Sequence, residues 1–364
     1  MLTMLNRRLR TSSPIGLDLG AGGIRAAQTV RRRDCWTVER VTIYEHPDRN
    51  DESSGSPHAD DVERCMQQAE FRGTVTVAAL SAPDVEFHAL ELPEQVMSQQ
   101  ADTAEQVVKW EVERLTTFRG VDVRARHWLL PAATGSAPNA MGLVSPRDVI
   151  TRLVDVCSTG RFHCDRVEAA AFAMCRVSAA VLGTRKNEVW GVLDLGERQA
   201  RVAVCVGDVP VLVRSVGTGG REWTDRVAVT LNITRRAAEI HKCDHGVALD
   251  ARRAKERAPT SKIASIVHGA IRGELSALSN EVKRSFEYVL GCYPNRDVTD
   301  LVLVGGGAKT RNLPDLLENA LGVRVRRISD LLDEPNCRLT LGTMSNVTLD
   351  RTAVAIGLTL ESLE

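Results

Sequence analysis

A net charge, a long apolar run and a paired-cysteine motif are all missing from this 364-residue sequence. Lysine plus arginine and aspartate plus glutamate each number 47, so the net charge is zero and does not suggest a nucleic-acid partner. No apolar run approaches the roughly 18 to 20 residues of a membrane span. The start, MLTMLNRRLRTSS, has its basic residues after a very short apolar stretch, the wrong order for a signal peptide. We therefore expect a cytoplasmic protein that does not cross a bilayer.

The nine cysteines include no CxxC pair, and several lie in apolar segments such as AFAMC and VAVCV. Buried reduced thiols are therefore the expectation. One run, His241-x-Cys243-x-His245, has the residue types of a metal site. On a helix, however, alternate spacing distributes three side chains around the circumference, which argues against a shared metal ion.

The stretch IGLDLGAGGIRAA, at residues 15–27, combines an apolar strand pattern with an acid and a cluster of glycines. The alternation predicts a strand with one buried face. Gly20, Gly22 and Gly23 then predict a tight turn whose backbone N–H groups could face an anion. A hairpin turn that needs positive φ explains the same glycines without any ligand. The stretch alone leaves both interpretations open.

The motif returns about half a chain later as WGVLDLGERQAR, with Asp194 and Gly196 in the places of the first acid and glycine. Two such copies predict two related lobes rather than one long domain. After each copy come further strand-like segments and then alternating helices and strands, which is an α/β arrangement.

Between Val85 and Leu130 lies a strand–helix–strand segment that the repeat does not need. Val108, Val112 and Leu115 recur at i, i+4 and i+7 in its helix, which predicts one buried face and one charged face. We interpret this segment as a β-α-β subdomain inserted into the first lobe. The following strand, AMGLVS, is assigned to the first lobe itself.

A set of segments, taken in order, resembles the actin-like ATPases, in particular the FtsA and PilM families. They are IGLDLGAGGIRAA, ELPEQVMSQQADTAEQVVKWEVERLTTF, VLDLGERQA, VGTGGREWT, TDLVLVGGGAKTRNLP and AVAIGLTL. The resemblance implies an α/β protein with the actin-like ATPase fold, in which two ribonuclease-H-like lobes carry an inserted β-α-β subdomain in the first lobe. The boundaries implied are 14–84 and 139–185 for the first lobe, to which helix 350–364 returns, 85–138 for the insert, and 186–349 for the second lobe with a helical subdomain at about 219–295.

The resemblance also implies ATP and Mg²⁺ as ligands, bound between the lobes. Asp18 and Asp194 would hold Mg²⁺ through water, while glycine loops approach the phosphates and the adenosine. Without the resemblance, Glu239 and Lys242 would be an ordinary i, i+3 pair on a solvated helix face. The implied nucleotide-binding residues are Asp18, Gly20, Gly22, Gly23, Arg25, Asp194, Gly196, Glu239, Lys242, Gly305, Gly306 and Gly307.

Both phosphate loops depart from the family pattern. The first has glycine and alanine where hydroxyl side chains are usual, with Arg25 at a lysine position, and the second reads GERQAR without hydroxyls or a further acid. Glu197 adds a like charge near a triphosphate, which at about 5 Å costs roughly 3 kcal/mol, unless Arg25, Arg198 and Arg201 offset it. We therefore expect ATP and Mg²⁺ binding to be weak or lost and turnover to be poor, and we assign no catalytic residue.

The function implied is a PilM-like scaffold of type IV pilus assembly at the inner face of the cell membrane. It would hold the tail of a PilN-like inner-membrane protein in a groove between the insert and the first lobe, with pilus motor ATPases and further copies of itself as other partners. Two alternatives stay open: an active actin-like ATPase or phosphotransferase, and the related assembly protein of type II secretion. Gene neighbourhood would separate pilus from secretion partners.

Overall fold

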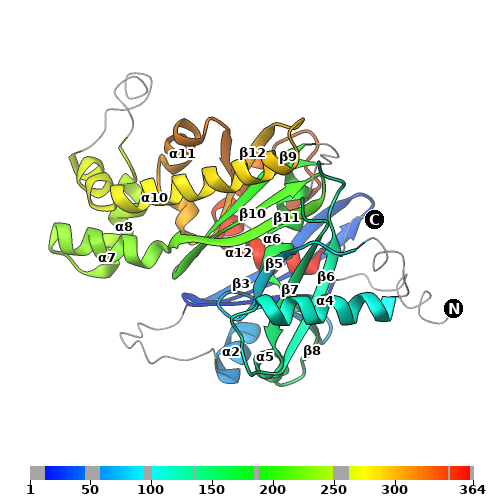
Figure 1. Cartoon of the computed structure of the whole chain (residues 1–364). Helices are drawn as coiled ribbons and strands as arrows, with labels where there is room; N and C mark the ends of the chain where they lie inside the picture. The colour runs from blue at the N-terminus through cyan, green and yellow to red at the C-terminus, as the bar shows by residue number, and fades with distance from the viewer. Residues whose placement is uncertain are drawn as a thin grey trace. The chain divides into compact units, whose positions relative to one another are not determined.

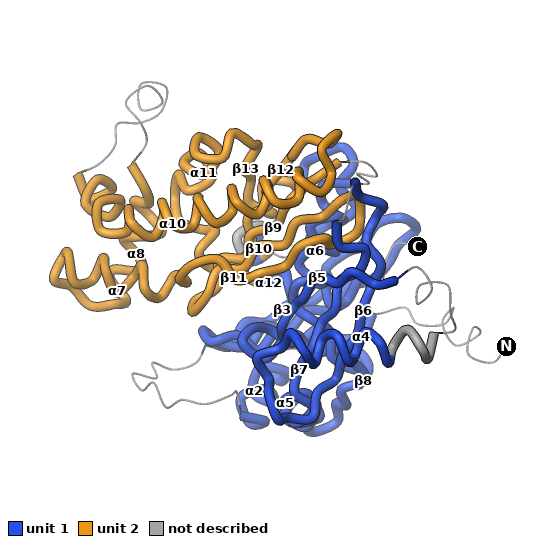
Figure 2. Tube along the Cα trace, in the orientation of Figure 1, with its two compact units in different colours: residues 1–184, 332–348, 352–364 blue, residues 185–331, 349–351 orange. Residues whose placement is uncertain are grey.

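The structure is a computed structural model that describes residues 13–45, 58–93, 101–134, 137–183, 188–248, 262–342 and 345–360 (Figure 1). Two compact units divide the chain (Figure 2). Unit 1 comprises Met1–Thr184, Leu332–Thr348 and Thr352–Glu364, and unit 2 comprises Arg185–Leu331 and Leu349–Arg351. The basic N-terminal tail and the last residues of the predicted C-terminal helix lie outside the described residues.

A six-stranded sheet in the order β14-β3-β2-β1-β4-β8 forms the centre of unit 1. The first three strands of the chain form an antiparallel meander, and the other three join it in parallel. The strands are β1 (Ile15–Gly20), β2 (Gly23–Arg32), β3 (Cys35–Glu45), β4 (Val75–Leu80), β8 (His163–Ala169) and β14 (Leu339–Leu341).

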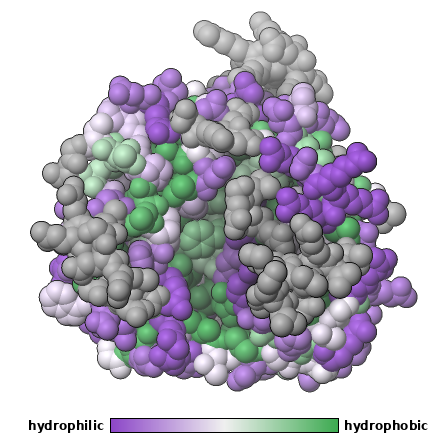
Figure 3. Space-filling view, turned by 90° about the vertical axis from the view of Figure 1, so that its right-hand side faces the viewer, coloured by the Kyte–Doolittle hydropathy of each residue, from purple (hydrophilic) through white to green (hydrophobic). Residues whose placement is uncertain are grey.

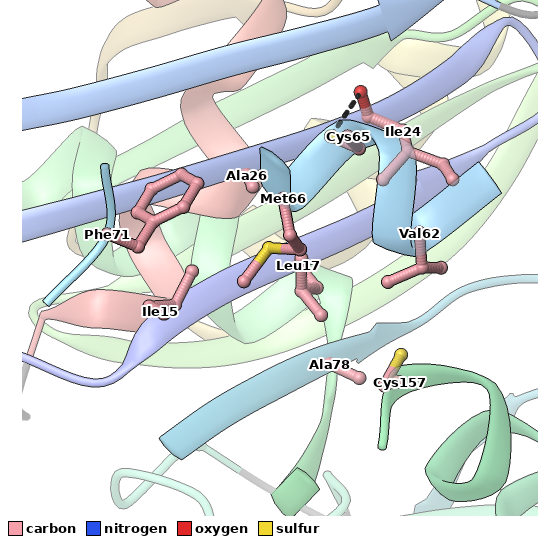
Figure 4. Packing of buried hydrophobic residues seen from close by; sticks show 10 residues of the cluster. All are labelled: Ile15, Leu17, Ile24, Ala26, Val62, Cys65, Met66, Phe71, Ala78 and Cys157. Carbon is pink, nitrogen blue, oxygen red and sulfur yellow. Dashed lines mark hydrogen bonds between the residues drawn. The ribbon is translucent and has the colours of Figure 1, made fainter. Parts of the chain in front are cut away.

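Helices α2 (Ala59–Gln67) and α5 (Arg147–Cys157) contribute to the core on one face of this sheet. Figure 4 shows Ile15 and Leu17 of β1 beside Met66 and Val62 of α2, all of them almost fully buried. Each such side chain stabilises the unit by about 1.5 to 3 kcal/mol when it leaves water. The predicted alternation in the first motif is thus confirmed as a buried strand face.

Helices α6 (Ala170–Leu182) and α12 (Asn346–Thr359) also pack in unit 1. Gly16 points to the face opposite Ile15 and Leu17, and a Cβ there would clash with the carbonyl oxygen of Ala355 in α12. Gly357 of α12 allows a similarly close approach to α6 at Ala173. The first glycine of the opening motif is therefore explained by helix packing.

The insert consists of β5 (Glu86–Leu90), α4 (Ala101–Leu115), β6 (Val123–Leu129) and β7 (Ala140–Pro146), with the sheet order β5-β7-β6. Val108 and Val112 of α4 are buried against this sheet, as predicted. The prediction was wrong for Leu115, which is 40% exposed. The helix ends there, because Thr116 and Thr117 turn to donate hydrogen bonds to Glu86.

Two sequence assignments were wrong at the level of sheets. Strand β7, assigned to the first lobe, is the central strand of the insert, paired on both sides and buried on both faces. The insert therefore extends beyond 138 to Pro146. Strand β14, placed in the second lobe by the boundary at 349, pairs with β3 in unit 1. The other predicted boundaries stay predictions.

Unit 2 repeats the strand order of unit 1, with β11-β10-β9-β12-β13 corresponding to β3-β2-β1-β4-β8. Three antiparallel strands are again followed by two parallel ones. The predicted duplication is therefore confirmed. The strands are β9 (Val189–Leu195), β10 (Gln199–Val206), β11 (Val209–Thr218), β12 (Val298–Val304) and β13 (Arg324–Arg327).

The helices of unit 2 follow the predicted order with one difference. The segment 220–243, expected to be helical throughout, forms two helices. Asn232 takes a left-handed conformation with φ +52° and ends the first helix, and the Thr234 side chain accepts a hydrogen bond that caps the second. The helices are α7 (Gly220–Leu231), α8 (Arg235–His245), α10 (Lys262–Cys292), α11 (Leu313–Leu321) and the short η1 (Gly306–Lys309) and η2 (Ile328–Leu331).

Candidate nucleotide site

The second Asp-x-Gly acid, near the end of β9, is bound by an arginine of the neighbouring strand. Asp194 is only 4% exposed. Arg201 lies opposite it in the antiparallel pair of β9 and β10, and its Nη2 donates to Oδ2 of Asp194 at 2.5 Å. Residues directly opposite on one face of a sheet lie close enough for such a pair. The predicted magnesium ligand of unit 2 is therefore already paired with a cation.

The glycine loop after β12 lies beside Asp194, because β12 runs parallel to β9 and the two strands end together. Gly305 has φ +88°, and a Cβ there would clash with Oδ1 of Asp194. Its N–H donates to the carbonyl oxygen of Asp350 at 2.7 Å. Gly307 is close to the side chain of Leu195, whereas a Cβ on Gly306 would meet nothing within 4 Å. The fold thus brings Asp194 and the predicted adenosine loop together.

The loop that follows Asp194 is held by the start of α7. Gly220 N donates to Gly196 O at 2.9 Å, and Arg221 N donates to Glu197 O at 2.8 Å. A Cβ on Gly219 would clash with the carbonyl oxygen of Glu197, so the glycine allows this close approach. The first N–H groups of a helix are the ones that bind phosphates elsewhere. Here two of them already bond to the loop itself.

Lys242 is not on a solvated helix face, because its side chain is only 2% exposed. Its Nζ donates to the carbonyl oxygen of Gly220 at 3.0 Å and to Oγ1 of Thr224 at 2.7 Å. It also forms an ion pair with Glu239 at 2.6 Å, and that carboxylate accepts a hydrogen bond from Thr224. Lys242 and Glu239 therefore join α8 to the first turn of α7.

The Glu239 carboxylate is stabilised in its ionised form. Burial alone would raise its pKa, but the ammonium of Lys242 and the hydrogen bonds from Lys242, Thr224 and Cys243 together lower the pKa below its ordinary value. The neighbouring thiol shows the opposite effect, since burial and the Glu239 charge raise the pKa of Cys243 to about 11. Both shifts indicate a compact, internally paired cluster.

The first copy of the motif has the same register but different side-chain contacts. Arg25 lies opposite Asp18 in the pair of β1 and β2, and its Nη1 donates to Gly23 O at 3.0 Å. The guanidinium lies against Gly20, where a Cβ would clash with Nη1. Gly23 has φ +139°, and a Cβ there would clash with Tyr44 O in β3. The turn therefore needs Gly23 for the sheet, whatever it binds.

The predicted residues of unit 1 lie close together, whereas those of the His241-x-Cys243-x-His245 run do not form one site. Within unit 1, β1 and the turn after it bring Asp18, Gly20, Gly22, Gly23 and Arg25 into one neighbourhood. The His241-x-Cys243-x-His245 run does not converge, since the two imidazoles stack on each other and the thiol contacts Glu239. Among the described residues, no group of three or more His, Cys, Asp or Glu side chains is arranged to hold a metal ion.

Two functional contacts were missed from the sequence. From the sequence, Arg201 is expected only as a charge that could offset Glu197, whereas in the structure it is the ion-pair partner of Asp194. Its position carried a signal, because Arg25 and Arg201 both follow their acids by seven residues and so lie opposite them across a short hairpin. Thr224 was expected only as part of a helix start and proves to bridge Lys242 and Glu239.

Part of the chain matches a known protein family, and its structure is similar to solved structures. The family model of the cell division protein FtsA matches residues 191–357. A chain of the PilM-PilN type IV pilus biogenesis complex is similar in structure with a TM-score of 0.76, at 21% identity over 96% of this chain and 98% of that one. No curated protein matches the chain in a sequence comparison.

Two further solved structures overlap less closely. The ethanolamine utilization protein EutJ from Carboxydothermus hydrogenoformans has a TM-score of 0.49, at 14% identity over 96% of this chain and 90% of that one. Ta0583, an archaeal actin homolog, has a TM-score of 0.44, at 14% identity over 95% and 98% of the two chains. The TM-score of 0.76 with the chain of the PilM-PilN complex and the match to the FtsA family model, not these two structures, show that the chain has the actin-like ATPase fold, and they confirm the resemblance to PilM and FtsA that its sequence predicted.

Proposed function

We propose that this chain is a PilM-like cytoplasmic scaffold of type IV pilus assembly, which binds the cytoplasmic tail of a PilN-like inner-membrane protein. The observation that carries the proposal is the likeness to a chain of the PilM-PilN complex, at 96% of this chain. The remaining 4% is smaller than the insert, so the likeness includes the part that the duplicated lobes do not need. None of the described helices has the length and apolar character that a membrane crossing requires.

The partner surface that we propose is an aromatic junction, defined as Phe87 of β5, Trp128 of β6 and Phe172 of α6. The rings of Trp128 and Phe172 meet edge to face with centroids 4.8 Å apart, and Phe87 lies 6.3 and 6.5 Å from the two. All three side chains are half-buried. Half-buried aromatic side chains at a junction of two elements are typical anchors for a partner.

The insert also has strands at the two edges of its sheet, to which an extended tail could add. Its sheet has the order β5-β7-β6, so β5 and β6 are edge strands within it. An extended segment can add to such an edge by main-chain hydrogen bonds, with side-chain pockets giving specificity. Figure 3 shows apolar and hydrophilic residues together on the side of the molecule that it draws. The edge strands and the aromatic junction support a site for an extended tail with apolar side chains.

The nucleotide site takes a secondary place in this proposal. Asp194 is paired with Arg201, and Lys242 is paired with Glu239, before any ligand arrives. We infer that ATP and Mg²⁺ bind weakly or not at all and that hydrolysis is at most slow. Pilus motor ATPases and a second copy of the chain are further partners of the proposed scaffold.

The test is a titration of a fluorescent peptide, with the sequence of the PilN-like tail encoded nearby, against the full chain by anisotropy. Trp128→Ala and Phe172→Ala should each weaken binding by about ten- to a hundredfold, because each removes an anchor ring. The matched control is Trp110→Ala on α4, where the tryptophan is 69% exposed and belongs to the charged side of the helix. It should leave binding within about twofold.

Two results would contradict the proposal. The first is no binding of the tail by the wild-type chain. The second is undiminished binding by both junction variants, which would place the partner site elsewhere. Deletion of residues 85–138 is a poor test, because it removes β5 and β6, the strands on both sides of β7.

A further inference from the structure

Mg²⁺ is the metal that an actin-like fold implies beside the Asp-x-Gly acids, and Asp194 does not fit it. Mg²⁺ needs carboxylate or phosphate oxygens in near-octahedral geometry, together with several water molecules. One oxygen of Asp194 accepts the hydrogen bond from Arg201, and the other lies against the backbone of Gly305. Both oxygens of Asp194 therefore already have close neighbours within unit 2.

The cation beside Asp194 is part of the fold. The side chains of Arg201 and Asp194 are 17% and 6% exposed. Arg201 is fixed by the register of β9 and β10, which is continuous from residue 195 paired with 200 to residue 189 paired with 206. A planar guanidinium is always charged and binds carboxylates in a defined orientation. The pair is therefore a permanent feature of unit 2.

The surroundings keep this pair in place. Glycine allows Gly305 to approach the acid on one side, and the start of α7 holds the loop at Gly196 and Glu197 by two backbone hydrogen bonds. Lys242 adds a second internal cation at the first turn of the same helix. Unit 2 therefore supplies two internal cations, Arg201 beside the end of β9 and Lys242 at the first turn of α7.

We propose that the guanidinium of Arg201 has taken over the electrostatic role of the divalent metal, so that Asp194 is a structural anion and not a magnesium ligand. The end of β9, the start of β10 and the glycine loop at Gly305 are then held together without nucleotide or metal. This inference does not depend on the identity of the partner. It concerns how unit 2 keeps its loops ordered.

The experiment is thermal unfolding of the full chain, with Mg²⁺ added at constant ionic strength or removed by EDTA. The wild type should change its Tm by less than about 1 °C between the two, since Asp194 is already paired with Arg201. Asp194→Asn should lower the Tm by about 6 to 10 °C even in EDTA, because it leaves Arg201 without its partner in a largely buried position. Arg201→Lys keeps the charge and should lose less than Asp194→Asn.

The double variant Asp194→Asn/Arg201→Gln should recover part of the loss of Asp194→Asn, since it removes the unpaired cation. A wild-type Tm that rises with Mg²⁺, and no longer rises in Asp194→Asn, would overturn the proposal. So would an Asp194→Asn variant as stable as the wild type in EDTA. If Asp194→Asn does not fold, the response of the wild type to Mg²⁺ still decides between the two outcomes.

Discussion

The two copies of the Asp-x-Gly motif share a backbone and differ in how they use an arginine. In both, the acid lies near the end of a central strand, and an arginine seven residues later lies opposite it in the register. Arg201 binds its acid in unit 2, whereas Arg25 of unit 1 donates to a turn carbonyl and lies over Gly20. The duplicated fold therefore fixes where the charges are, and the local contacts decide what each charge does.

The largest difference in stability between the two copies is expected when each acid is replaced. Asp194→Asn leaves Arg201 largely buried and unpaired, and we expect it to reduce the free energy of unfolding by about 3 kcal/mol or more. Asp18 is only half-buried, so Asp18→Asn should reduce the free energy of unfolding by less than about 1 kcal/mol. Urea unfolding followed by circular dichroism measures both. Equal losses for the two variants would mean that the copies are not used differently.

The glycine loop gives the next largest effect. Gly305→Ala introduces a Cβ against Asp194 and requires φ +88° of an alanine, so we expect a loss of about 2 kcal/mol. Gly306→Ala is the matched control in the neighbouring position, where a Cβ has open space. It should change the stability by no more than about 0.5 kcal/mol. A Gly305→Ala variant as stable as the control would show that the loop does not press on the acid.

The ion pair of Glu239 should make the stability of unit 2 depend on pH. The folded pKa of Glu239 lies below its ordinary value near 4.5, so folding favours the ionised form. Its stabilisation is therefore fully present above that ordinary value and is lost as the pH falls through the folded pKa. Glu239→Gln should be less stable than wild type by about 1 kcal/mol at pH 7. The difference between them should shrink below pH 4.5 in parallel urea titrations, and a constant difference would contradict this assignment.

Arg25 should give the smallest effect. Its guanidinium donates to Gly23 O, and its Nε is buried without a hydrogen-bond partner. We expect Arg25→Ala to cost less than about 1 kcal/mol, since one bond to a neutral carbonyl is lost. Arg201→Ala, measured in the same way, should cost several times more. If Arg25→Ala is the more damaging variant, unit 1 and not unit 2 carries the structural ion pair.

The fold could be predicted from sequence to a large extent, because its signals are local and repeated. The apolar alternation in 15–20 and the apolar run in 189–195 predicted the two central strands, and the repeated acid and glycine predicted the duplication. The central strand of the insert could not be predicted in this way. Its position between the preceding strand β6 and the more distant β5 is decided by tertiary contacts, and its residues suit a lobe strand equally well.

The candidate site was predicted in its residues but not in its pairing. Asp194, Gly196 and the loop at Gly305 were predicted near one another, and unit 2 brings them together. The role of Lys242 could not be predicted, because a spacing of i, i+3 from Glu239 is equally typical of a solvated face. Only the packing of α8 on α7 makes its amine a buried donor.

The most direct test of the account measures tail binding by the wild-type chain in two solutions, one with ATP and Mg²⁺ and one with EDTA. If internal ion pairs hold the loops of the scaffold, the tail should bind with the same dissociation constant, within about twofold, in both solutions. Binding that appears only with ATP and Mg²⁺, or that tightens about tenfold with them, would contradict it. In that case the nucleotide site controls the partner surface.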